Sequence, residues 1–330
     1  MTLAVVYNLL ALLATIALGW LVQRQGWLRR KVDVGDSGGA GHVAEVLGNA
    51  VLYLFIPALL FRTMVRQDLS AMPLRMLAAY FVPALVYALW VYAWQRFLLA
   101  QGGAAPATRA IAAVYGNSVQ LGIPLVTALF GEPGLALHIA VVSLHGMVLL
   151  TTLTVLAETD LARAGATVSR WATLLTALRN TVVHPLLLPV LAGLLWNATG
   201  LGLHPVADQV LQMLSLPVVP VSLLLIGVSL ALSGVRDRWR AAGPVIALKL
   251  LVLPALVLVT ARYGFGLRGM PLSVLVMMAA LPVGTNALVF AQRYNNLQGE
   301  ASVAIVVSTL AFLATAGLWL AVLGALGSGL

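Results

Sequence analysis

The chain has 330 residues, of which 61% are hydrophobic and only 9% are charged, and its mean hydropathy is +1.00. A soluble domain carries about 25% charged residues, so this composition predicts a polytopic membrane protein. The absence of cysteine excludes a disulfide framework, a thiolate metal site and a cysteine nucleophile. The net charge of +9 does not predict a nucleic-acid partner, because the basic residues lie in short loops between apolar runs.

Ten apolar segments are long enough to cross a bilayer as helices, since about 20 helical residues span the hydrocarbon core. In chain order they cover residues 3–22, 43–65, 73–94, 108–130, 134–157, 181–198, 211–232, 243–263, 271–292 and 300–323. The first has neither a basic n-region nor an evident cleavage site, so we expect a retained helix rather than a signal peptide. The predicted fold is all-α, with ten transmembrane helices and no separate soluble domain.

The basic residues are distributed unevenly between the two predicted faces of the membrane protein. Alternate assignment of the loops places 13 Lys and Arg residues on one side and 5 on the other, and Lys249 within the eighth segment completes the 19. Loops rich in Lys and Arg are usually cytoplasmic. We therefore expect both termini to lie outside.

Two segments carry polar, helix-breaking stretches near their centres, namely Gly116-Asn-Ser-Val-Gln-Leu-Gly-Ile-Pro124 in the fourth and Leu281-Pro-Val-Gly-Thr-Asn286 in the ninth. Proline removes a backbone donor and clashes with the preceding turn, and glycine loosens a helix. Each segment is therefore predicted to form two half-helices joined by unwound backbone. The residues expected to make these breaks are Gly116, Gly122, Pro124, Pro282 and Gly284. A single break can be a harmless kink, but two in corresponding positions indicate a transporter's binding site.

The order of these features also predicts an internal repeat. The second segment contains Pro57 and the seventh contains Pro220, each followed by an apolar run, while the fourth and ninth contain the breaks. Segments one to five then correspond to segments six to ten, and an odd number of crossings per repeat requires opposite orientations. We expect a five-helix repeat over residues 1–165 and an inverted copy over residues 166–330.

The polar residues within the apolar segments favour an anion as ligand. Four of the ten acidic residues are expected at segment ends and six in loops, which argues against a proton pump built on carboxylates. Half-helix N-termini and free backbone N–H groups attract negative charge, and Asn117 and Asn286 add amide donors. A carboxylate could then be held without a buried cation. The alternative is that each asparagine only satisfies the broken backbone.

Three other polar residues lie within apolar segments. His145 is expected near mid-depth, either coupling protons to transport or serving as a neutral core residue, and His138 is expected nearer the outer surface. Lys249 lies close enough to the predicted cytoplasmic end of its helix to extend its ammonium group to the interface.

The motifs around both breaks resemble those of the auxin efflux carrier family, within a superfamily that includes bile-acid/sodium symporters. The resemblance rests on Gly116–Leu125 with Leu129-Phe-Gly131, and on Leu281–Asn286 with Val289–Tyr294. It implies a ten-helix inverted repeat in which helices four and nine cross at the substrate site. It further implies a scaffold of helices one, two, six and seven and a mobile transport domain of helices three to five and eight to ten. It also implies that asparagines at the crossing hold the carboxylate of the substrate. Bacterial members similar to this chain include malonate and malate permeases.

The sequence therefore predicts a secondary transporter (permease) of small organic anions in a bacterial inner membrane, with elevator-type alternating access. The expected substrate-binding residues are Asn117, Asn286, Ser118, Gln120 and Thr285, with Pro57 and Pro220 lining the scaffold and His145 as the candidate for proton coupling. The alternative is a sodium-coupled symporter of bile-acid type, although Ser118, Gln120 and Thr285 offer few oxygens for Na⁺.

Coupling to H⁺ or Na⁺ and a homodimer formed through the scaffold stay open at this stage. The expected partners are a small carboxylate and the lipid bilayer, without a metal or cofactor. The signatures of an intramembrane enzyme, such as HExxH or paired aspartates, are missing from the sequence, so an enzyme is not expected.

Overall fold

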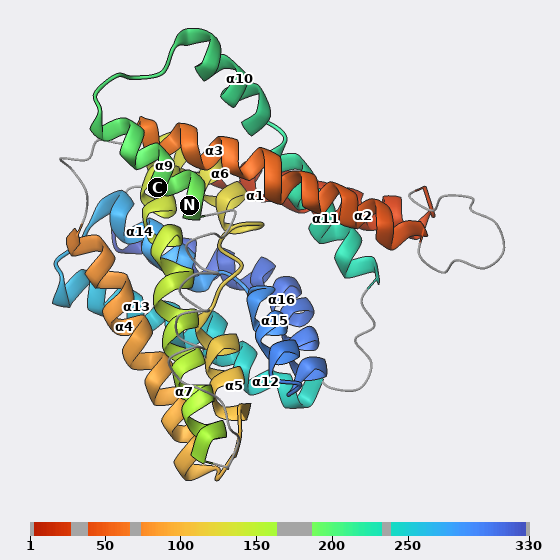
Figure 1. Ribbon diagram of the computed structural model, residues 1–330, viewed down its shortest axis with the longest axis vertical. Coiled ribbons are helices and arrows are strands. Elements are labelled where there is room, and N and C mark those ends of the chain that lie inside the picture. The colour runs from red at the N-terminus through yellow and green to blue at the C-terminus, as the bar shows by residue number, and fades with distance from the viewer. Residues whose placement is uncertain (1–2, 28–38, 67–73, 164–186, 233–238, 328–330) are drawn as a thin grey trace.

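The computed structural model describes residues 3–27, 39–66, 74–163, 187–232 and 239–327 (Figure 1). Within these ranges the regular structure is helical, and the only extended pairing is an isolated antiparallel bridge between Gly116 and Val283. The N-terminal half contains α1 (Leu3–Arg24), α2 (Gly39–Ala50), α3 (Ile56–Val65), α4 (Leu74–Ala93), α5 (Ala105–Val114), α6 (Gly122–His145) and α7 (Thr151–Arg163). Short π-helical turns link α2 to α3 and α6 to α7, so these pairs form long continuous helices.

The C-terminal half follows a related order. It contains α9 (Leu187–Ala198), α10 (Pro205–Ser215), α11 (Val218–Leu232), α12 (Trp239–Ala247), α13 (Leu253–Val259), α14 (Gly269–Ala280), α15 (Asn286–Arg293) and α16 (Gln298–Ala325). A π-helical turn, Leu248–Val252, joins α12 to α13. The bounds agree closely with the apolar segments of the sequence. The first residues of the sixth segment, 181–186, lie outside the described part of the chain.

Among the described residues, six helical stretches are long and apolar enough to cross a membrane. They are Val46–Val65, Leu74–Leu98, Gly122–Leu161, Pro205–Val228, Ala242–Gly264 and Gln298–Ala325. Two shorter apolar helices, Leu188–Ala198 and Gly269–Ala280, accompany them. This confirms the predicted all-helical membrane protein, whereas ten crossings and the inverted repeat remain predictions.

The most extensive helix contact joins α1 to α11, and their backbones approach very closely. A Cβ atom placed on Gly227 would lie 2.0 Å from the carbonyl oxygen of Ile16, and one on Gly19 would lie 2.2 Å from that of Leu224. Helices in a membrane gain little from hydrophobic association, so small residues that permit close packing hold such pairs together. The glycines therefore fix the α1–α11 pair.

A second group of helices packs around α14, whose residues from 272 to 280 are all buried. This helix packs against α6, α13 and α16, and α4 packs against α5 and α13. In Figure 1, α2 and α3 form one long rod across the upper part of the molecule, while α4 and α7 run downward from it. Helix α6 contacts both groups, because its Ile123 and Ile139 pack with residues of α3 and α11. It therefore links the two parts of the fold.

Candidate functional site

The two predicted helix breaks are present, and they pair with each other. α5 ends at Val114 and α6 begins at Gly122, while α14 ends at Ala280 and α15 begins at Asn286. The backbone N–H of Asn117 donates to the carbonyl of Pro282 (2.8 Å), and that of Gly284 donates to the carbonyl of Tyr115 (2.9 Å). Unwound backbone inside a membrane must find partners within the protein. Each break supplies these partners to the other.

The glycines of the breaks permit this pairing. A Cβ atom on Gly284 would lie 2.8 Å from the carbonyl oxygen of Gly116, closer than real side chains approach. One on Gly116 would lie 3.2 Å from Cβ of Leu281. Any larger residue at position 284 would push the two breaks apart, so glycine is required there by close approach.

Four half-helix ends converge where the two breaks pair, a place that we call the crossover. The C-terminal ends of α5 and α14 bring partial negative charge, and the N-terminal ends of α6 and α15 bring partial positive charge. Pro124 is buried in the first turn of α6, where a missing N–H costs nothing because the first turn has no helical acceptor for it. The crossover therefore combines free backbone groups with both signs of partial charge in a small volume.

The two predicted asparagines lie at these ends. Asn117 is 8% exposed, and its carbonyl accepts a hydrogen bond from the N–H of Gly122 (3.0 Å). Asn286 is half-buried at the first position of α15, and its side chain lies near that of Tyr115. Tyr115 belongs to the other break, so a side-chain contact reinforces the backbone pairing.

The remaining predicted site residues differ in exposure. Ser118 is buried, while Gln120 and Thr285 are exposed at the ends of their breaks. Pro57 is half-buried in the first turn of α3, and Pro220 is exposed on α11. Their roles in binding or in lining the scaffold stay predictions.

His145 lies against the first break. It is fully buried, with Nδ1 at 3.5 Å from the Ser118 hydroxyl and Nε2 at 3.3 Å from the Tyr80 hydroxyl. Its ring stacks on that of Tyr115 with centroids 4.3 Å apart. This contact set connects the histidine to two residues of the break, and its part in proton coupling remains a prediction.

His138 was expected nearer the outer surface of the membrane than His145, and this expectation stays a prediction. The residue is fully buried, and its Nε2 donates to the carbonyl of Ser118 (2.8 Å). The cause is a kink at Gly131, whose φ of 63° interrupts α6 and brings the following turns back beside the break. The ring lies so close to Gly122 that a Cβ there would be 2.7 Å from Nε2.

Lys249 does not extend to the interface, which corrects the expectation made from its sequence position. Its side chain is fully buried in the π-helical turn between α12 and α13, and Nζ donates to the carbonyl of Ala279 (2.6 Å). That carbonyl belongs to the last turn of α14, which begins the second break. The crossover therefore has a buried lysine beside it, and whether the carboxylate needs a charge partner there stays open. A lysine within an apolar segment is by itself a signal of function.

Two acidic residues expected in loops, Asp160 and Asp208, lie in α7 and α10 instead. Each acidic side chain that the structure describes forms an ion pair with an arginine: Arg62–Glu132, Arg62–Asp208, Arg66–Asp208, Arg96–Asp160, Arg109–Glu300 and Arg293–Glu158. This pairing explains how carboxylates are accommodated in an apolar chain.

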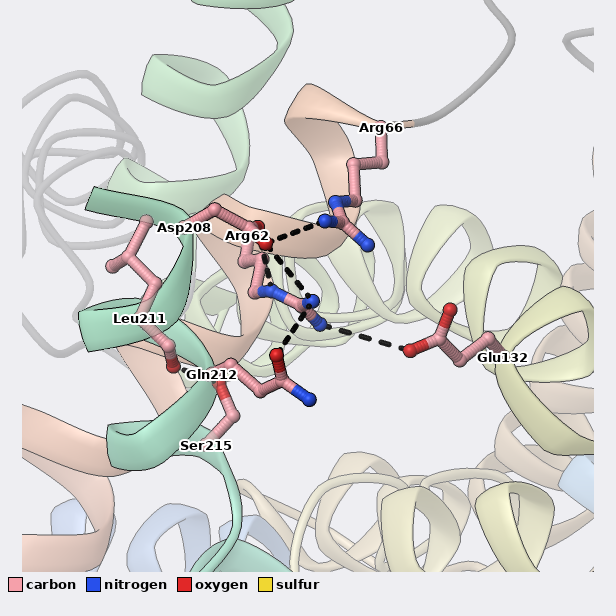
Figure 2. Close-up of polar contacts among 7 residues, drawn as sticks. All are labelled: Arg62, Arg66, Glu132, Asp208, Leu211, Gln212 and Ser215. Atoms are coloured by element: carbon pink, nitrogen blue, oxygen red, sulfur yellow. Dashed lines mark hydrogen bonds and ion pairs between the residues drawn. The ribbon is translucent and has the colours of Figure 1, made fainter. Parts of the chain in front are cut away.

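The largest of these clusters joins three helices. Arg62 on α3 contacts Asp208 on α10 through Nε (2.9 Å), and Figure 2 shows its guanidinium between Asp208, Gln212 and Glu132. The Arg62–Glu132 contact measures 3.6 Å and connects α3 to the kink of α6. Hydrophobicity patterns gave no indication of this cluster.

Comparison with known proteins adds to these observations. Residues 4–320 match the family described as "Membrane transport protein". The chain is 27% identical over 282 residues to a protein of Rhizobium meliloti (strain 1021) named "Putative malonate transporter", covering 83% of this chain and 86% of that protein. It is 28% identical over 283 residues to an "Uncharacterized transporter" of Methanothermobacter thermautotrophicus, covering 85% of this chain and 89% of the other.

Proposed function

The chain belongs to the membrane transport protein family, the auxin efflux carrier family that its motifs resemble, and from this premise we propose that it is a secondary transporter of small organic anions. Membership makes it a membrane transporter and not an enzyme. The proposed substrates are small mono- or dicarboxylates. The name of the Rhizobium relative supports malonate as the first to test.

The observation that carries this proposal is the reciprocal pairing of the two breaks. The bonds from Asn117 to Pro282 and from Gly284 to Tyr115 hold two unwound segments together within an apolar protein. Such backbone is tolerated at membrane depth where it lines a cavity or is buried in protein, and it forms the ion and substrate sites of many transporters. A site at this crossover is the simplest reason for the chain to keep both breaks.

In the proposed site, the amides of Asn117 and Asn286 donate to the substrate carboxylate. The N-terminal ends of α6 and α15 add partial positive charge, and Ser118, Gln120 and Thr285 provide further polar contacts. Hydrogen bonds to a charged group contribute about 1.5–3 kcal/mol each, so two or three of them offset much of the desolvation of a carboxylate.

The helix pairings support elevator-type movement of one part against another. Helix α1 pairs with α11, and α3 pairs with α9. In the proposed inverted repeats α1 corresponds to α9 and α3 to α11, so the repeat would relate one pair to the other. The contacts of α4 with α5 and of α13 with α14 form a second equivalent pair. We assign α1–α3 and α9–α11 to the scaffold and the other helices to the transport domain, with repeats at residues 1–165 and 166–330.

The competing function is a sodium-coupled symporter of organic anions. A sodium site needs several convergent oxygen ligands. Among the residues that the structure describes, no cluster of three or more His, Cys, Asp or Glu side chains could hold a metal ion, and the described carboxylates are paired with arginines. Backbone carbonyl, hydroxyl and amide oxygens can also bind Na⁺, so the dependence of uptake on a Na⁺ gradient decides between the two functions.

Uptake into proteoliposomes tests the proposal. Purified protein should accumulate radiolabelled malonate, with unlabelled dicarboxylates competing and uncharged malonamide failing to compete. Parallel assays with an inward Na⁺ gradient, an inward H⁺ gradient and neither gradient identify the coupling ion. Uptake that requires Na⁺ would favour the symporter, and no uptake of any small carboxylate would contradict an organic-anion carrier.

A further inference from the structure

Lys249 is a buried lysine that the proposed mechanism has not used. It lies within the apolar stretch Ala242–Gly264, in the π-helical turn Leu248–Val252, and its side chain has no exposed surface. An amino group in such a place is costly unless it is paired, because its hydration is lost. The chain must therefore gain something from keeping an ionisable amino group there.

The position of the ammonium group relates it to both breaks. Nζ donates to the carbonyl of Ala279, in the last turn of α14. A Cβ atom on Gly116 would lie 3.4 Å from the same Nζ, which places the ammonium beside the first break as well. Lys249 thus stands where the end of α14 meets the unwound segment of the other crossing helix.

The contacts of the ammonium leave its charge incompletely compensated. The negative end of α14 offers only about half an elementary charge. An ammonium has three donors, and among the residues that the structure describes Nζ donates to the carbonyl of Ala279. The acidic side chains that the structure describes are each paired with an arginine elsewhere. An anion entering the crossover would supply the negative charge that is otherwise lacking.

We propose that Lys249 is the charge partner of the transported anion, an ammonium fixed on the carbonyl of Ala279 that makes the crossover selective for carboxylates without a bound metal cation. The inference rests on the proposed function and adds to it a residue that determines specificity. The asparagines position the carboxylate by hydrogen bonds, and Lys249 compensates its charge. The substrate class is accordingly an anion, with affinity rising with the number of its negative charges.

Two neutral variants separate the charge from the hydrogen bond. Lys249→Gln keeps a donor for the Ala279 carbonyl, and Lys249→Met removes both the donor and the charge. Replacing a buried charge by an apolar side chain of similar size is often tolerated, so the variants are expected to fold. Leu251→Met, at an exposed position of the same π-helical turn, controls for the presence of methionine there. Thermal unfolding in detergent checks each variant.

The decisive measurement is the affinity of each protein for malonate, with two carboxylates, and for malonamate, with one. A fixed charge acts on every charge of the ligand, so its removal should weaken malonamate binding about tenfold and malonate binding about a hundredfold. Wild type and Leu251→Met should show the same affinity, with no change when choline replaces sodium in the buffer.

The possible results distinguish this inference from the proposed function. Wild-type protein that binds no carboxylate refutes both. If wild type binds but Lys249→Gln binds malonate equally well, the transporter stands and the charge-partner role is overturned. Equal losses for malonate and malonamate also overturn it, since a purely structural lysine would affect both ligands alike.

Discussion

The proposed contact between Asn286 and the substrate carboxylate gives the most direct prediction. Asn286 begins α15, and its side chain is half-buried near Tyr115, so its amide lies at the crossover rather than free in solvent. Removing one hydrogen bond to a carboxylate costs about 1.5–3 kcal/mol, which corresponds to about a tenfold to hundredfold loss of affinity. We expect this loss for Asn286→Ala, and a comparable loss for Asn117→Ala.

The aspartate variant sharpens this prediction because it changes charge with almost no change in shape. A carboxylate at position 286 would lie about 6 Å from that of the substrate, where like charges repel by about 3 kcal/mol at an effective dielectric constant of about 20. Asn286→Asp should therefore bind malonate more weakly than Asn286→Ala, by about a further factor of ten to a hundred.

Equilibrium binding of radiolabelled malonate to purified protein, together with uptake into proteoliposomes, measures both effects. Gln25→Ala serves as the control, because this amide is exposed and lies beyond the end of α1. Thermal unfolding shows whether each variant remains folded. Wild-type affinity in Asn286→Asp would refute the reasoning, because no carboxylate could then bind beside that position.

Four other predictions follow from particular contacts. Gly284→Ala should lower the free energy of unfolding by about 1–3 kcal/mol and abolish uptake. Gly317→Ala, with open space around the glycine, should change neither, as thermal unfolding and uptake assays would show. His145→Gln should remove any stimulation of uptake by a pH gradient, and unchanged stimulation would make the histidine structural only. Arg62→Met should lower the temperature of thermal unfolding because it leaves Asp208 with one arginine. Glu132→Gln should have almost no effect on it, because this carboxylate is 76% exposed and its contact with Arg62 measures 3.6 Å. A C-terminal reporter active only in the cytoplasm should remain silent, and a strong signal would refute the assigned orientation.

The helices and the two breaks could be predicted from the sequence because their causes are local. Apolar runs of sufficient length predict membrane helices, and Pro124 and Pro282 with their neighbouring glycines interrupt helices wherever they occur. The positions of Asn117 and Asn286 beside the breaks follow from the same motifs. The pairing of one break with the other is not local, since it joins residues more than 160 positions apart, and only the weak repeat pointed to it.

The errors concern residues whose surroundings depend on distant parts of the chain. The burial of Lys249 depends on the end of α14, 30 residues later, so its distance from its own helix end predicted the wrong environment. By contrast, His138 lies beside Ser118 because Gly131 redirects the chain, at the position of the gap between the fourth and fifth apolar segments. Asp208 was assigned to a loop because the apolar segment was drawn from residue 211, whereas α10 begins at Pro205 and Arg62, 146 residues earlier, pairs with the carboxylate.

The close packing of α1 on α11 restricts how the molecule can change shape. With Cβ positions 2.0 and 2.2 Å from backbone atoms of the facing helix, no layer of side chains separates the two at these points. Sliding between packed helices needs side chains that can change rotamer and interlock again. Such a layer exists between α6 and the helices α3 and α11, where Ile123 and Ile139 meet Leu60 and Val218. Shear is therefore blocked within the α1–α11 pair and permitted along α6, so the boundary between fixed and moving parts should run through this apolar layer.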